Sequence, residues 1–185
     1  EMKRKFIPLI ICFLICAILG ACSDAKNNTN EKENNKTETA TVKKSNSEYY
    51  FEDDIIKVPE GTIKLTGSRI ITPDDHEFIN DYSLLITVEF TNDSSLLQEP
   101  RFVWMNYVSL FQNQDKTISQ LIPSYDYSLL DEYTQTADYA IQKVKPGATV
   151  KCVFAYELID TTSPVALVVL KNYTEELGIK VYKLQ

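Results

Sequence analysis

The chain has 185 residues, of which 19 are lysine or arginine and 26 are aspartate or glutamate, giving a formal charge of -7 at pH 7. A net negative chain without basic runs beyond its first residues is a poor candidate for nucleic-acid binding, because that function relies on cations that neutralise phosphates. The single histidine excludes metal sites built from several histidines, and the hydrophobic share of 44% excludes disorder throughout the chain.

The first 22 residues resemble the export signal of a bacterial lipoprotein. Residues 2–5 are mainly cationic, and residues 6–19 form an apolar run that is too short for a transmembrane helix but typical of a signal peptide. The run ends in the lipobox-like residues Leu19, Gly20, Ala21 and Cys22. In such a signal the small residues admit the peptidase and the thiol forms a thioether to a diacylglyceryl group, so we expect lipidation of Cys22.

This resemblance predicts a signal peptide over residues 1–21 and a mature chain that begins at Cys22. We expect the diacylglyceryl anchor to hold the chain at the outer face of the cell membrane of a Gram-positive-type bacterium. Two acyl chains anchor firmly, because each buried methylene contributes about 0.8 kcal/mol. Two of the four cysteines lie in the signal and one is lipidated, so only Cys152 remains and no disulfide is expected within the mature chain.

Residues 22–48 contain the lipidated cysteine and a polar linker without aromatic residues. This composition cannot bury enough apolar surface to offset the entropy of ordering, which predicts a disordered tether. Residues 49–185 are long enough for one domain, and they contain 11 basic and 20 acidic residues. The negative charge is therefore concentrated in the domain, whose surface should repel anionic polymers and lipids.

Alternating hydrophobicity predicts an all-β domain. Residues 84–91 and 150–158 alternate between two sets of side chains with a period of two, which is typical of half-buried strands. Further strands are expected at residues 63–72, 101–111, 118–122, 165–170 and 179–184. The prolines of the domain separate these runs, and residues 125–139 have room for a short helical turn. The pattern predicts an immunoglobulin-like β-sandwich of about seven to eight strands, preceded by the signal peptide and the tether.

Short motifs in the domain are similar to those of a known family. They are LLITVEFTN at residues 84–92, VSLFQN at 108–113, VKPGATV at 144–150, and AYEL followed by SPV within 155–165. In order and spacing they resemble the immunoglobulin-like domain of unknown function at the end of many Gram-positive lipoproteins, a neighbour of telokin-like secreted domains. The resemblance covers residues 63–170 and implies the fold and the location. It departs at Gln114, in a turn that usually carries a glycine, which predicts a longer turn there.

No catalytic residue, metal or cofactor is expected from the reactive side chains of the domain. Cys152 alternates in phase with Val150 and Phe154, which favours a buried thiol. His76 lies among three carboxylates in an expected surface loop, but the spacing matches neither a zinc motif nor a calcium loop. Trp104 lies in a stretch that is apolar on both alternating faces, which predicts a core position on a central strand.

The segment of residues 125–139 mixes tyrosines with carboxylates. Tyrosine offers a rigid ring with a polar tip, which suits contacts with proteins or sugars. The residues expected at such a contact surface are Tyr125, Tyr127, Asp131, Glu132, Tyr133 and Tyr139. Two alternatives are a long connection whose tyrosines cover the edge of the sandwich, and a carboxylate-based hydrolase in which Asp131 and Glu132 act together.

We interpret the chain as a membrane-anchored lipoprotein whose acidic domain is a non-catalytic module that binds an envelope protein or glycan. Three alternatives stay open on the sequence. They are an exclusion lipoprotein acting against phage or conjugation machinery, the carboxylate-based hydrolase, and a purely structural role in the envelope. Phage or conjugation genes beside this one would favour the first of these.

Overall fold

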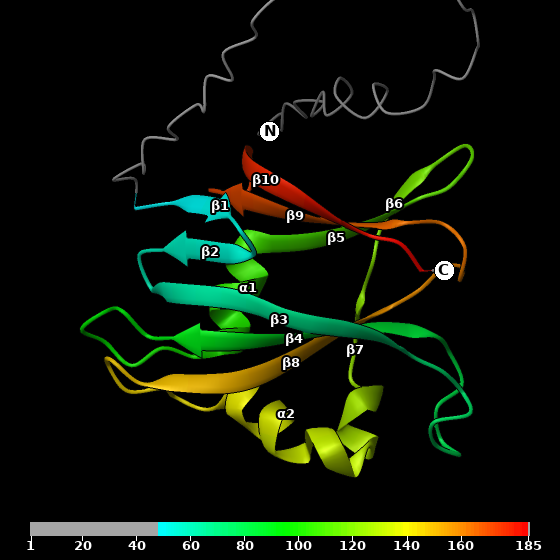
Figure 1. Ribbon diagram of the computed structural model, residues 1–185, viewed down its shortest axis with the longest axis horizontal. Helices are drawn as coiled ribbons and strands as arrows, with labels where there is room; N and C mark the ends of the chain where they lie inside the picture. Colours follow the sequence, from blue (N-terminus) through cyan, green and yellow to red (C-terminus); the bar gives the residue numbers. More distant parts are fainter. Residues whose placement is uncertain (1–47, 185) are drawn as a thin grey trace, which may run out of the picture. The chain divides into compact units, whose positions relative to one another are not determined.

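A computed structural model describes residues 48–184, which contain two antiparallel β-sheets (Figure 1). The first sheet has six strands in the order β1-β2-β3-β4-β8-β7, and the second has four in the order β10-β9-β5-β6. The strands are β1 (Tyr50–Glu52), β2 (Ile55–Val58), β3 (Gly61–Ile71), β4 (Ser83–Thr91), β5 (Val108–Asn113), β6 (Ile118–Gln120), β7 (Pro123–Ser124), β8 (Thr149–Glu157), β9 (Val165–Lys171) and β10 (Glu175–Tyr182). The predicted signal peptide, Cys22 and nearly all of the tether lie outside the described residues. Within residues 48–184, no helix has the length and apolar character needed to cross a membrane.

The strand order matches that of an immunoglobulin-type sandwich. Strands β3, β4, β8 and β7 occupy the positions of strands A, B, E and D of such a domain. Strands β10, β9, β5 and β6 occupy those of G, F, C and C′. The predicted all-β sandwich is therefore confirmed. Its two most clearly alternating segments form β4 and β8, which pair with each other along their whole lengths.

The β1–β2 hairpin adds two strands to the seven or eight that the sequence predicts. Its turn is formed by Asp53 and Asp54, whose φ angles of 49° and 64° lie in the left-handed region. Two consecutive left-handed residues suit a tight hairpin turn, but the Asp-Asp pair lacks the glycine that usually marks one in a sequence. Strand β2 extends the first sheet along the beginning of β3, where it pairs with residues 61–64.

Apolar side chains form a core on each face of the first sheet. The main core lies between the two sheets and includes Val88 of β4 and Leu167 of β9. A smaller cluster lies on the outer face, where Leu85 and Val153 are covered by the connection between β7 and β8. This connection comprises the 3₁₀ turns η2 (Asp126–Leu129) and η3 (Asp131–Tyr133) and helix α2 (Thr134–Ile141), which lies alongside β8 in Figure 1. The short helical turn predicted for this segment is thus confirmed.

The single strand predicted over residues 101–111 is wrong. Helix α1 (Pro100–Tyr107) occupies most of this range, and only β5 is a strand. Pro100 lies in the first turn, where proline is tolerated because the N–H that it lacks would have no partner within the helix. The buried residues of the helix are Pro100, Val103 and Trp104, and their spacing of three and four brings them to one helical face.

The core position predicted for Trp104 is confirmed, although the residue lies on a helix. Its side chain is 1% exposed. The indole ring stacks on Phe154 with 4.5 Å between the ring centroids, and the Nε1–H donates a hydrogen bond to the hydroxyl of Tyr156 at 2.8 Å. Because Phe154 and Tyr156 belong to β8, these two contacts fasten α1 to the first sheet.

The turn between β5 and β6 accommodates the departure from the family at Gln114. The two strands pair as far as Asn113 and Ile118, so residues 114–117 form the loop. The loop is closed by the N–H of Gln114, which donates to the carbonyl of Thr117 at 2.9 Å. None of residues 114–117 has a positive φ angle, so no position in this turn requires a glycine.

Candidate functional site

The residues predicted for a contact surface differ widely in exposure. Tyr125, which precedes η2, is 57% exposed, whereas Tyr127 within η2 is 7% exposed. Tyr133 packs against the cluster on the outer face of the sheet, and Tyr139 packs against the main core. The chain therefore presents Tyr125 to solvent and uses the other three tyrosines wholly or partly for packing.

Tyr127 belongs to the hydrophobic cluster on the outer face of the first sheet. It shares this cluster with Leu130 of the same connection and with Val153 and Ala155 of β8. Burial raises the pKa of the Tyr127 phenol above its ordinary value. The alternative in which tyrosines cover the sandwich therefore describes this residue, which leaves little of its ring for a partner to contact.

Arg69 of β3 holds the acidic part of the connection in place. Its guanidinium donates to Glu132 Oε1 at 2.8 Å and to Asp75 Oδ1 at 2.6 Å. The N–H of Thr72 also donates to Asp75, and together with Arg69 it holds the pKa of that carboxyl below its ordinary value. Glu132 is thus held in an ion pair with an arginine. Asp131, its neighbour in sequence, is exposed.

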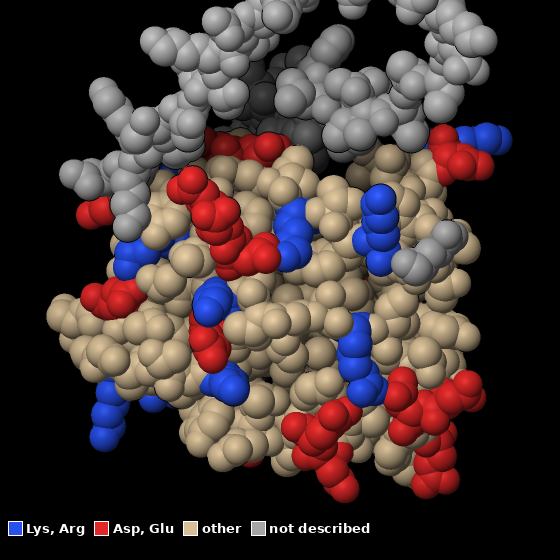
Figure 2. Space-filling view, viewed as in Figure 1, with Lys and Arg blue, Asp and Glu red and all other residues tan. Residues whose placement is uncertain are grey.

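Acidic side chains gather at the end of the molecule that carries the β3–β4 loop (Figure 2). This loop spans residues 72–82 and contains Asp74, Asp75, Glu77 and Asp81. Its centre exposes Phe78, which is 65% exposed. Basic side chains are scattered over the same view and form no comparable group on this face.

Neither Cys152 nor His76 lies in surroundings that suggest catalysis. Cys152 is 1% exposed, which confirms the predicted buried thiol. Burial raises its pKa to about 12, so the thiol stays protonated and is a poor nucleophile. His76 lies in the β3–β4 loop, where its Nδ1 accepts a hydrogen bond from the N–H of Phe78 at 3.3 Å. Among the residues from 48 to 184, no group of three or more His, Cys, Asp or Glu side chains is arranged to hold a metal ion.

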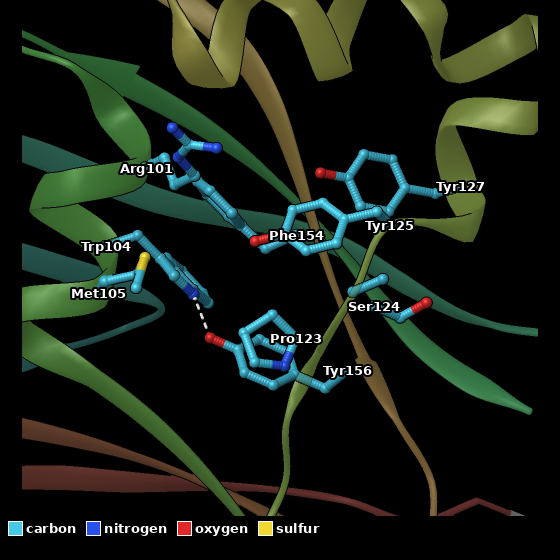
Figure 3. Close-up of a pocket in the computed structure, with 10 residues that line it drawn as sticks. Arg101, Trp104, Met105, Pro123, Ser124, Tyr125, Tyr127, Phe154 and Tyr156 are labelled. Carbon is cyan, nitrogen blue, oxygen red and sulfur yellow. Dashed lines mark hydrogen bonds between the residues drawn. The ribbon is translucent and has the colours of Figure 1, made fainter.

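A shallow notch lies between helix α1 and the segment from β7 into η2 (Figure 3). Its lining includes Trp104 and Phe154, and the hydrogen bond from Trp104 to Tyr156 crosses its base. The notch has a volume of about 20 Å³. This is room for about one water molecule, so the notch suits the tip of one inserted side chain and is too small for a complete ligand.

Large exposed side chains lie on both sides of this notch, and a further one on α1 lies next to its lining in the sequence. Met105 on α1 is 50% exposed, and Tyr125 across the notch is 57% exposed. Phe102, on the same helix, is 54% exposed, and Arg101 lies over its ring, with 5.6 Å between the guanidinium carbon and the ring centroid. Tyrosine, phenylalanine, methionine and arginine are enriched in the cores of protein interfaces. We call Arg101, Phe102, Met105 and Tyr125 the notch surface.

Sequence reasoning identified one of these four residues, Tyr125, and missed the three on α1. The cause is the strand predicted for residues 101–111, because a strand does not separate these side chains into the buried and exposed faces that a helix has. Pro100 was the available signal, because proline is favoured in the first turn of a helix. A helix beginning there buries Val103 and Trp104 and turns Phe102 and Met105 outward.

The fold and the notch define a small β-sandwich domain of immunoglobulin-type strand order with an exposed aromatic surface beside a helix. The chain belongs to the family described as a domain of unknown function, DUF5067, whose model matches residues 35–171. This membership confirms the resemblance to a domain of unknown function that the sequence motifs indicate. A comparison with curated proteins gives no match.

The solved structures that are similar to this chain include two with TM-scores above 0.5. A candidate lipoprotein from Staphylococcus aureus has a TM-score of 0.64 at 20% sequence identity, covering 72% of this chain and 90% of that one. A protein from Enterococcus faecalis has a TM-score of 0.56 at 16% identity, covering 72% of this chain and 92% of that one. Both structures come from Gram-positive bacteria, and at these identities the likeness establishes the shared fold.

Proposed function

We propose that this protein is a lipid-anchored protein of the outer face of the cell membrane, and that its sandwich is a non-catalytic binding module. Support for the anchor comes from the residues Leu19, Gly20, Ala21 and Cys22 and from the description of the Staphylococcus aureus neighbour as a candidate lipoprotein. Support for a non-catalytic domain comes from the protonated, buried thiol of Cys152 and from the ion pair that occupies Glu132.

The observation that supports binding most directly is the notch surface. Phe102, Met105 and Tyr125 each leave about half of a large apolar side chain in water. Such exposure beside a rigid indentation is typical of a site that accepts an anchoring side chain from a partner. The base of the notch is rigid because Trp104 is held by both stacking and a hydrogen bond. The proposed partner is an envelope protein that inserts an apolar side chain there.

Replacing the lipidated residue tests the anchor. Cys22→Ala removes the thiol that forms the thioether, so we expect the protein either to be released from the membrane fraction into the medium or to remain as an unprocessed precursor. Cell fractionation followed by immunoblotting measures this, and Cys16→Ala in the predicted signal is the matched control. Normal cleavage together with unchanged membrane retention of Cys22→Ala would contradict the proposed anchor.

Crosslinking in intact cells tests the notch surface. A photoreactive benzoylphenylalanine at position 125 should give one discrete adduct, detected by mass shift, whereas the same group at position 78 should not. Phe78 is the matched control because it is an exposed aromatic residue outside the notch surface. Met105→Asp should reduce the adduct at position 125 several-fold, since a carboxylate opposes insertion of an apolar side chain. Equal adducts at positions 78 and 125 would count against this binding site.

A further inference from the structure

A second hollow lies at the opening between the two sheets, where strand pairing along β3 stops. Strand β2 pairs with β3 only through Lys64, and at the next residue the N–H of Leu65 donates to the carbonyl of Asp54 at 2.8 Å. The register of β3 with β4 shifts between Leu65 and Gly67, which marks a bulge. Beyond this point the outer edge of β3 has no strand partner among the described residues.

The hollow has a volume of about 210 Å³. Asp54 of the β1–β2 turn, residues 65–68 of β3, and Lys180 and Tyr182 of β10 line it. The space equals that of about seven water molecules at roughly 30 Å³ each. It is therefore large enough for a small molecule, in contrast to the notch beside α1.

The charges in the hollow balance each other. Lys180 Nζ lies 2.5 Å from Asp54 Oδ1, and both side chains are partly exposed. An ammonium group has three donors and a carboxylate has two oxygens, so this ion pair leaves both groups with hydrogen-bonding capacity. Ser68, which is exposed, adds a hydroxyl from β3. The lining therefore offers donors and acceptors with no net charge.

Tyr182 contributes a hydrogen-bonding group that is not used. The residue is 8% exposed, and its hydroxyl finds no hydrogen-bond partner among the described residues. A buried hydroxyl without a partner is unfavourable, because water no longer solvates it. Lys180 Nζ lies over the ring at 5.6 Å from its centroid. The flexible stem of this lysine permits Nζ to shift off the ring while it stays within reach of Asp54.

We propose that this hollow binds a small, neutral, polyhydroxylated ligand, namely a single sugar unit. Sugar hydroxyls both donate and accept, so they can bond to the remaining oxygen of Asp54, to Lys180 and to Ser68 while the ion pair stays intact. A charged or zwitterionic ligand would instead compete with that ion pair. One sugar hydroxyl that reaches Tyr182 supplies the partner that this residue lacks. This site is separate from the notch surface and does not depend on it.

The test uses the full chain in a detergent without sugar groups, with saturation-transfer NMR as the measurement. Glucose and N-acetylglucosamine are the neutral probes, and glycylglycine is the zwitterionic probe. We expect saturation of at least one of the two sugars and none of glycylglycine. Saturation of neither sugar would overturn the proposal, and so would binding of glycylglycine alone.

Two variants test whether the sugar binds in this hollow. Ser68→Leu fills the space from an exposed position and should weaken sugar binding at least tenfold. Tyr182→Phe removes the unpaired hydroxyl, so it should weaken binding several-fold while the unfolding midpoint of the ligand-free protein stays the same or rises. Tyr173→Phe is the control, because that exposed tyrosine donates to Asn106 outside the hollow. A lower midpoint for Tyr182→Phe would show that its hydroxyl is already paired, and unchanged sugar binding by both variants would place the sugar elsewhere. Either result overturns the proposal.

Discussion

Trp104→Ala should lower the free energy of unfolding by about 3–5 kcal/mol, measured by urea denaturation of the full chain. The substitution leaves a cavity next to Phe154 and removes the N–H that donates a hydrogen bond to the hydroxyl of Tyr156. A domain of this size has a total stability of about 5–15 kcal/mol. The loss is therefore a large share of the total, and the base of the notch would collapse with it.

Phe102→Ala is the matched control for Trp104→Ala. Both residues are large aromatics on α1, but Phe102 is 54% exposed whereas Trp104 is 1% exposed. Truncation of an exposed side chain usually changes stability by no more than about 0.5 kcal/mol. Similar losses of stability for the two variants would contradict the helical arrangement. In a strand, residues 102 and 104 would lie on the same face and would be buried to a similar extent.

Gln112→Leu should lower the free energy of unfolding by about 2–4 kcal/mol. Gln112 is completely buried, and its Nε2 donates to the carbonyls of Asp160 and Ser163 at 2.7 and 2.9 Å. Its Oε1 accepts from the N–H of Ile159 at 2.8 Å. Leucine has a similar size but no hydrogen-bonding groups, so these backbone groups of the β8–β9 loop lose their partners. Hydrogen exchange should accordingly show loss of protection at the Ile159 N–H.

Gln120→Leu is the control for this effect, because Gln120 is exposed on β6. Its replacement should change stability by no more than about 0.5 kcal/mol. The β8–β9 loop is also stabilised by hydrogen bonds of its own, because Asp160 accepts from the N–H groups of Ser163 and Thr162. These bonds hold the pKa of the Asp160 carboxyl well below its ordinary range. A stability change below about 1 kcal/mol for Gln112→Leu would mean that this local order suffices without the glutamine.

Gln112 also shows why a motif can be recognised before its role is known. The sequence VSLFQN places Gln112 in phase with the apolar residues Val108 and Leu110 of β5. This phase favours a buried position, and a buried amide needs partners. The partners lie about fifty positions away in the β8–β9 loop, a separation over which a local pattern carries no information. Only the pairing of β5 with β9 in the second sheet brings the two together.

The candidate contact surface was predicted in part for the same reason. The composition of residues 125–139 indicates contacts by tyrosine, but it does not decide which rings face solvent. That depends on the outer face of the first sheet, where Val153 and Ala155 provide an apolar surface that is covered by Tyr127, its neighbours in this connection and Ile79 of the β3–β4 loop. Tyr125 stays exposed because it lies before the first 3₁₀ turn, opposite α1.

The sequence by itself determined the all-β class and the segments that became β4 and β8, because a period of two appears directly in the order of the residues. It also placed Cys152 and Trp104 in the core. The apolar residues of 100–107 satisfy strand and helix spacing alike, and Pro100 marks only where a helix can begin, so tertiary structure decided that this segment is a helix. Burial of Trp104 against Phe154 and Tyr156 of β8 resolves that ambiguity, and it thereby turns Phe102 and Met105 outward to complete the notch surface.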